Sequence, residues 1–229
     1  MTVEGGASGF FERLNRTLSP ARFGSYKKQT GHDHDALCKY VWNTLICEAL
    51  YPSFQILEVG FRNALHSEIA KRSGDQTWLM NGGVFLYEDE RDVIAKSRSS
   101  ALSRIPALSE DILVAEMNFG FWTTLLDARY DTIWHKIIKE VFPNMPRSSR
   151  TRKEASKSMN TVRRLRNAAL HHHSIWHWSD LQRQHGEMHE LIYWICASAS
   201  KLAKEIDRFP LVYSQGHGHY SELCRRISN

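Results

Sequence analysis

The apolar residues between Phe54 and Ile69 recur almost all the way round a helix, and this constrains the fold more than any other feature of the chain. They are Phe54, Ile56, Leu57, Val59, Phe61, Ala64, Leu65 and Ile69. A helix that is apolar on nearly every side must be buried on nearly every side. The segment belongs to a helical stretch from about Asp33 to Lys71, in which Pro52 predicts a kink or a break. We therefore expect a long buried helix with other elements packed around it.

The remaining elements are also predicted to be helices, because the apolar spacing is helical and no stretch alternates as a strand would. Ser19 and Pro20 predict an N-cap and a first helical residue, opening a short helix that runs to about Gln29. Further helices are expected at residues 88–103, 109–116, 120–141 and 148–170. A helix over 179–209 carries four heptads of 4-3 spacing, typical of a core spine or a dimer seam. The fold class is all-α, a helical bundle with long N-terminal and C-terminal helices.

Length and composition set the domain organisation. A chain of 229 residues suffices for one large domain or two small ones. We expect a variable segment over residues 1–18, one domain over 19–209, and a loosely ordered tail over 210–229, where glycine and histidine alternate. No secretory signal and no apolar run of about 20 residues is present, which predicts a cytoplasmic protein without a membrane partner. The four cysteines lack metal-site spacing, so reduced and partly buried thiols are expected.

Positive charge is concentrated in one segment, between Arg147 and Arg166. It holds eight basic residues and one acid, and its net charge is +7, whereas the rest of the chain sums to −2. Concentrated positive charge on a nearly neutral body is typical of a site for a polyanion such as RNA. A solvated basic loop is the alternative. The residues predicted to bind RNA are Arg147, Arg150, Arg152, Lys153, Lys157, Arg163 and Arg164.

The same helix ends in Arg166-Asn167-Ala168-Ala169-Leu170-His171. Val162, Leu165 and Ala169 form an apolar stripe that predicts the core-facing side. If the helix continues to His171, then Arg163, Arg166, Asn167 and His171 share a polar patch. Asn167 could then hydrogen-bond the ring of His171 and fix its tautomer.

These residue types suit the cleavage of RNA without a metal. RNA carries its own nucleophile, the 2′-hydroxyl beside each phosphodiester. Histidine can transfer protons at neutral pH, and arginine presents a planar donor fork to phosphate oxygens. The products would be a 2′,3′-cyclic phosphate and a 5′-hydroxyl. An arginine and a histidine at this spacing can also be simple surface residues.

Two neighbouring features have competing interpretations. His173 and His177 have the spacing of zinc ligands on a helix, but a turn packed by Trp176 and Trp178 is the better interpretation, so no metal or other cofactor is expected. Glu58 and Arg62 are four residues apart on the long helix and can pair with each other. That pair could hold two helices together or assist a catalytic site.

Several motifs together resemble a known family. Arg166-Asn167 followed by His171-His172 resembles the signature of HEPN domains, in the form found in Abi-like (AbiD/AbiF) abortive-infection proteins of bacteria. Matching pieces occur in the same order along residues 19–209: Ser19-Pro20-Ala21-Arg22-Phe23, Tyr40-x-Trp42-Asn43, Glu48-Ala49-Leu50-Tyr51-Pro52, Leu57-Glu58-Val59-x-x-Arg62-Asn63-Ala64-Leu65, Phe119-Gly120-Phe121-Trp122 and Phe142-Pro143. Leu170 departs from the family, which usually has a small residue there.

The resemblance implies an all-α HEPN fold and a metal-independent endoribonuclease that acts in phage defence, often within a toxin–antitoxin system. It implies a homodimer that brings two Arg-x4-His motifs together, and a noncoding RNA or protein antitoxin as a further partner. Arg166 and His171 would be catalytic, Asn167 and His172 would assist, and Glu58 with Arg62 would support the site. Two alternatives stay open: a non-catalytic module that holds a structured small RNA, and a helical dimerisation protein without affinity for RNA.

Overall fold

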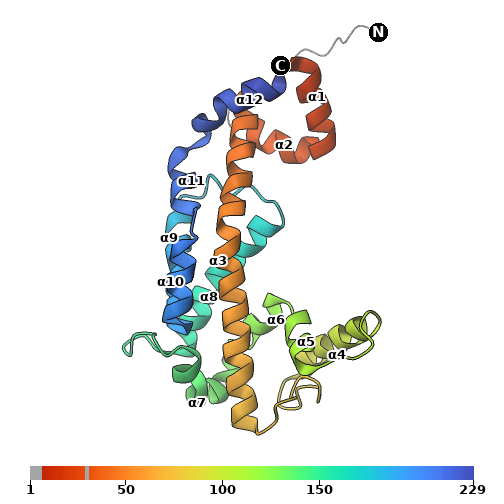
Figure 1. Ribbon diagram of the computed structural model, residues 1–229, viewed down its shortest axis with the longest axis vertical. Helices are drawn as coiled ribbons and strands as arrows, with labels where there is room; N and C mark the ends of the chain where they lie inside the picture. Colours follow the sequence, from red (N-terminus) through yellow and green to blue (C-terminus); the bar gives the residue numbers. More distant parts are fainter. Residues whose placement is uncertain (1–6, 29–30) are drawn as a thin grey trace. The chain divides into compact units, whose positions relative to one another are not determined.

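The computed structural model describes residues 7–28 and 31–229 of the chain and shows an all-α protein (Figure 1). The described residues contain helices and no strand, which confirms the predicted fold class. The α-helices are α1 (Ala7–Leu18), α2 (Pro20–Lys27), α3 (Asp33–Ser73), α4 (Glu88–Leu102), α5 (Glu110–Glu116), α6 (Phe119–Thr124), α7 (Asp131–Val141), α8 (Arg152–Leu170), α9 (Leu181–Ile195), α10 (Ala197–Glu205), α11 (Phe209–Gln215) and α12 (Ser221–Ser228). The described residues also form two 3-10 helices, η1 (Ala128–Tyr130) and η2 (His217–Tyr220). No described helix combines the length and the apolar character that crossing a bilayer requires.

The chain divides into two compact units rather than the single domain expected over residues 19–209. Unit 1 contains residues 1–51, 167–181 and 207–229, and unit 2 contains residues 52–166 and 182–206. Helices α3 and α8 each contribute residues to both units. Pro52, where a kink or a break was predicted, is the first residue of unit 2, and α3 continues through it as one helix.

Unit 1 is held together by aromatic side chains near both ends of the chain. Phe23 and Tyr26 of α2 are buried and pack edge-on against Tyr40 of α3, with ring centroids 6.3 and 5.6 Å apart. The indole N–H of Trp42 donates to the carbonyl of Val212 in α11 at 2.9 Å. Helix α2 begins as predicted, with the Ser19 hydroxyl accepting from the N–H of Arg22 and with Pro20 in the first turn. Its predicted end at Gln29 lies outside the described residues.

The loosely ordered tail expected over residues 210–229 is wrong, because most of this segment is helical. It forms α11, η2 and α12, and α12 contacts α1 within the same unit. Tyr220 and Cys224 are buried there, which gives the helix an apolar anchor. Cys38 and Cys224 are buried free thiols, and burial is the main cause that raises the pKa of Cys224 to about 12. The alternation of glycine and histidine over residues 216–219 suggested disorder, but the buried Tyr220 and Cys224 lie outside that short stretch.

Unit 2 buries the apolar half of α3, as its sequence predicted. Phe54, Leu57, Phe61, Leu65 and Ile69 are all buried, and the apolar residues between them are half-buried. The Phe61 ring stacks on Phe142 at 5.9 Å, and Phe142 stacks on Trp134 of α7 at 5.8 Å. These three buried rings form a continuous stack that links α3, the turn after α7 and α7 itself.

Two predicted helices are broken in the structure. The helix expected over 120–141 is divided into α6, η1 and α7, because the Asp127 carboxylate accepts from the N–H of Arg129 and starts a new element. The helix expected over 179–209 is divided into α9 and α10, with Cys196 extended between them (φ −155°, ψ 118°). The Cys196 thiol accepts from the N–H of Ala199 as an N-cap. The heptad pattern crosses this residue unchanged and therefore could not reveal the break.

Candidate nucleic-acid interface

Helix α8 carries most of the candidate residues, and its start and its buried side follow from sequence. The Thr151 hydroxyl accepts from the N–H of Glu154 at 3.1 Å, the N-cap half of a Thr-x-x-Glu capping box. The helix therefore begins four residues after the predicted Ser148, and this motif could have fixed its start. Val162, Leu165 and Ala169 are buried, which confirms the predicted core-facing stripe, and the buried Ala155 and Met159 extend it toward the start of the helix.

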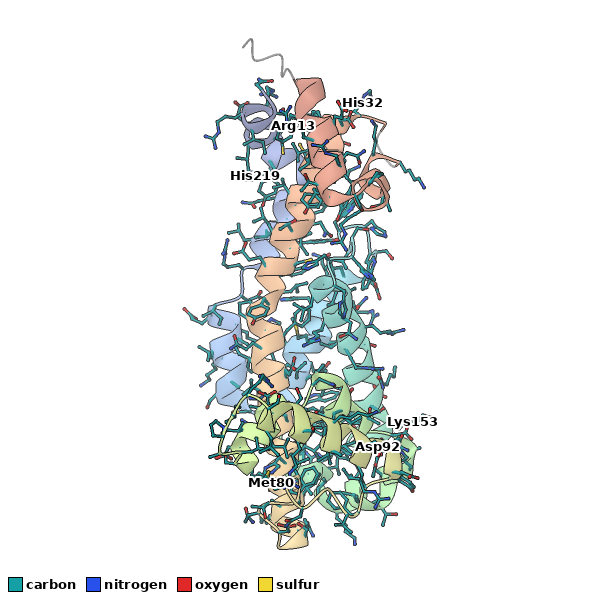
Figure 2. The ribbon with its side chains drawn as sticks, turned by 90° about the vertical axis from the view of Figure 1, so that its right-hand side faces the viewer. Arg13, His32, Met80, Asp92, Lys153 and His219 are labelled. Carbon is teal, nitrogen blue, oxygen red and sulfur yellow. The ribbon has the colours of Figure 1, made fainter. Side chains whose placement is uncertain are left out.

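The opposite side of α8 presents exposed cations at helical spacing. Lys153, Lys157 and Arg164 are all exposed and lie at intervals of four and seven residues, so they share one face of the helix. Lys157 is 3.6 Å from Glu154, an exposed pair that leaves both side chains largely hydrated. Figure 2 shows Lys153 at the outer surface of unit 2. We call Lys153, Lys157 and Arg164 the cationic face.

The other predicted RNA-binding residues differ in what they contact. Arg147 is exposed in the turn before α8. Arg150 instead donates to the carbonyls of Met145 and Pro143, so its guanidinium braces the turn after α7. Arg152 donates to the carbonyl of Leu126 at 2.8 Å and pairs with Asp131. Two of the residues predicted to bind RNA therefore make structural contacts within the protein. The net charge of the segment could not separate such residues from those that are free to bind RNA.

Arg166 pairs with Glu58, and this corrects the predicted Glu58–Arg62 pair. The Nη2 of Arg166 lies 3.2 Å from a carboxylate oxygen of Glu58, with side chains 25% and 22% exposed. Arg62 instead donates to the carbonyl of Ala115 at 3.4 Å, in the last turn of α5. Cations are favoured at the C-terminal end of a helix, where the last carbonyls lack partners. The i,i+4 rule considers α3 alone and could not predict that α5 and α8 supply the partners.

The end of α8 is a Schellman turn built on the three consecutive histidines. The N–H of His172 bonds to the carbonyl of Ala169 at 3.1 Å, and that of His173 bonds to the carbonyl of Ala168 at 2.8 Å. His172 has φ +60°, the left-handed conformation that this motif requires. His171 is exposed, and its N–H still bonds to the carbonyl of Asn167 at 2.9 Å. The helix thus ends at Leu170 as predicted, and His171 is the residue directly after it.

Asn43 holds the chain that follows this turn, within unit 1. Its side-chain oxygen accepts from the N–H groups of Ile175 and Trp176 at 2.7 and 3.1 Å, and its amide donates to the carbonyl of His173. The Trp176 ring packs against Trp42 at 6.1 Å, which confirms the predicted packing role of Trp176. Residues 173–177 are not helical, so His173 and His177 lack the one-turn helical geometry that the zinc interpretation required.

A conformational test follows from the left-handed residue. We expect His172→Gly to raise the free energy of unfolding by about 1 kcal/mol, because glycine adopts positive φ without the clash that a Cβ causes. Urea denaturation of the purified protein measures this. His173→Gly is the matched control, because His173 does not have a positive φ and should gain nothing from glycine. Among the described non-glycine residues, only Ser19 and His172 have a positive φ. Equal effects of the two substitutions would contradict the assigned turn.

A small cavity beside the cationic face was missed by sequence reasoning. It has a volume of about 140 Å³ and is lined by Thr123, Thr124, Asp127, Ser156, Asn160 and Arg163. Asn160 and Arg163 are three apart on α8 and hydrogen-bond at 3.2 Å, a pair that helical spacing could have suggested. The lining residues from α6 and from the start of η1 could not be placed there, because one continuous helix was expected over residues 120–141.

Comparisons with protein-family models, with curated proteins and with solved structures gave no match. Functional assignment therefore depends on the site geometry described above and on the motif resemblance.

Proposed function

We propose that the chain is a metal-independent endoribonuclease of the HEPN type, a cytoplasmic toxin of an abortive-infection or toxin–antitoxin system that acts in phage defence. The observation that carries the proposal is the order of groups along α8. An exposed cationic face is followed on the same helix by Arg166 and, directly after the helix, by the exposed His171. Lysine and arginine at helical spacing attract the RNA backbone, and a phosphate-binding arginine with a histidine supplies the chemistry.

In this mechanism His171 transfers protons, Arg166 stabilises the developing charge, and the neighbouring residues position these two. His171 accepts the proton of the 2′-hydroxyl or delivers a proton to the departing 5′-oxygen. Arg166 stabilises the charge that develops on the phosphorane oxygens. Glu58, paired with Arg166, fixes the direction of its guanidinium fork, and Asn167 and His172 hold the helix end that presents His171. No metal or other cofactor takes part.

One histidine cannot accept the 2′-hydroxyl proton and protonate the departing 5′-oxygen at the same time. This supports a dimer as the active form. A second copy of the chain, presenting its own Arg166 and His171, would supply the missing partner groups. A noncoding RNA or protein antitoxin would then restrain the toxin by covering the cationic face.

The RNA-binding part of the proposal predicts a change in salt dependence. We expect the triple variant Lys153→Ala/Lys157→Ala/Arg164→Ala to lower the slope of log affinity against log salt by about 2, because each single-strand phosphate contact contributes about 0.7. Fluorescence anisotropy with single-stranded RNA in EDTA measures it. Lys96→Ala/Lys139→Ala/Lys201→Ala removes three exposed charges elsewhere in unit 2 and should leave the slope unchanged. Equal slopes for both triple variants would contradict the cationic face.

A second candidate function is a non-catalytic module that holds a structured RNA. The Glu58–Arg166 pair favours it, because a carboxylate already neutralises the charge that the chemistry would use. The two functions are separated by incubating the purified protein with single-stranded RNA in excess EDTA. The nuclease cleaves it, and the binding module retains it intact with salt-dependent affinity.

The third candidate, a dimerisation protein without affinity for RNA, no longer has a continuous heptad helix because α9 ends before Cys196. One observation still supports it: Tyr193 of α9, Leu202 of α10 and Ile206 directly after α10 are exposed. Any salt-dependent RNA affinity would exclude it.

A further inference from the structure

The cavity beside the cationic face lies within unit 2 and has only polar side chains in its lining. Ser156, Asn160 and Arg163 come from α8, Thr123 and Thr124 from α6, and Asp127 from the start of η1. Ser156 and Arg163 each directly precede a member of the cationic face, so the cavity borders that face. Its volume of about 140 Å³ equals roughly four or five water molecules at ~30 Å³ each. That is smaller than most ligand pockets but of the order that one planar polar base requires.

Hydrogen bonds inside the protein fix which atoms of the lining are donors. The Nε of Arg163 donates to Asn160 Oδ1 at 3.2 Å, whereas no hydrogen bond to its two terminal nitrogens is found among the described residues. The Asn160 amide nitrogen donates to the backbone carbonyl and to the hydroxyl of Ser156. Asn160 therefore holds Arg163 in place, and the terminal guanidinium nitrogens form a donor pair at the cavity.

The opposite wall offers acceptors. The hydroxyls of Thr123 and Thr124 both donate to the carbonyl of Gly120 at 2.9 Å, so only their lone pairs remain for a ligand. Asp127 uses one carboxylate oxygen to accept from the N–H of Arg129 at 3.2 Å. Its second oxygen has no partner among the described residues. A free phosphate would meet this carboxylate and two hydroxyl acceptors, which disfavours an anion as the occupant.

A ligand with two adjacent acceptors on one edge and two adjacent donors on another matches this arrangement. Guanine has both: O6 and N7 accept from an arginine fork, and N1–H and N2–H donate to a carboxylate. We propose that the cavity is a guanine pocket, which takes an unpaired guanine of the RNA held on the cationic face. This inference rests on the RNA-binding part of the proposed function and does not depend on cleavage.

The test measures base preference by fluorescence anisotropy in EDTA, with His171→Ala protein so that the RNA stays intact. The probes are oligouridylates with one central guanosine, inosine or adenosine. Wild-type lining residues should bind the guanosine probe roughly tenfold more tightly than the adenosine probe. Inosine, which lacks the N2 amino group, should fall between them. Equal affinity for all three probes would overturn the pocket.

The decisive variant is Asp127→Asn. Asparagine keeps the cap on η1, so the fold is retained, but it replaces an acceptor with a donor and removes a negative charge. Guanosine preference should disappear while affinity for the adenosine probe stays the same or rises. Glu154→Gln removes a charge from α8 outside the cavity and should change all three affinities alike. A guanosine preference that survives Asp127→Asn would refute the assignment.

The result also separates this inference from the proposed function. Guanosine preference with no RNA cleavage by the wild-type protein would sustain the pocket and reject the nuclease. RNA cleavage without base preference would support the nuclease and reject the guanine pocket. If no RNA binds, saturation-transfer NMR with free guanosine and adenosine decides, since a guanine pocket transfers saturation to guanosine more strongly than to adenosine.

Discussion

Replacing His171 with alanine should lower the rate of RNA cleavage by at least about 10²-fold, since general acid–base catalysis by one positioned side chain contributes 10²–10⁴-fold. His171 follows α8 directly and is exposed, so the substitution removes a reactive imidazole without opening a cavity in the core. The measurement is the cleavage rate of single-stranded RNA in EDTA, with wild-type protein measured in parallel.

The matched control is His173→Ala, which removes another exposed imidazole two residues further on. Its backbone carbonyl still accepts from Asn43, so the turn is retained. We expect this variant to cleave at the wild-type rate. Cleavage that survives His171→Ala, or that is lost equally in both variants, would reject His171 as the catalytic histidine.

Replacing Glu110 with alanine should lower the free energy of unfolding by about 3–5 kcal/mol, the largest stability effect that we expect of a single substitution. The Glu110 carboxylate is 9% exposed and accepts from the N–H groups of Leu79 and Met80 at 3.0 and 2.9 Å. It also lies 2.8 Å from Nε2 of His66, which stacks on Trp78. Alanine would leave two backbone donors and a histidine without their acceptor.

Urea denaturation followed by circular dichroism measures this effect. Glu110→Gln keeps one carbonyl oxygen for the backbone donors and should cost less than Glu110→Ala. Glu140→Ala, on the exposed side of α7, should change stability by no more than about 0.5 kcal/mol. A loss below about 1 kcal/mol in Glu110→Ala would contradict the role of Glu110 as the acceptor that anchors the loop after α3.

The periodic apolar pattern was sufficient to predict the buried half of α3 and the buried side of α8. Phe61 and Leu165 are fully buried because each lies at the centre of an apolar stripe, a property that sequence displays directly. Single-residue interruptions are different. Cys196 and Asp127 end or start helices through one capping bond each, which leaves the surrounding periodicity unchanged.

The candidate site was predictable in composition but not in pairing. The sequence correctly predicted most of the basic residues on α8 and the end of that helix at Leu170, because both are local properties. It could not show that Glu58 meets Arg166, or that Arg152 binds Asp131, since these partners lie far apart along the chain. Nor could it locate the cavity at Arg163, whose lining requires the packing of α6 and η1 against α8.

The central claim is tested most directly by the chemistry of the RNA ends that the wild-type protein leaves in excess EDTA. Attack by the 2′-hydroxyl without a metal predicts fragments that end in a 2′,3′-cyclic phosphate and begin with a 5′-hydroxyl. Mass spectrometry of the fragments identifies both ends. Intact RNA, or fragments with 3′-hydroxyl and 5′-phosphate ends that form only when a divalent metal is added, would contradict the proposed nuclease.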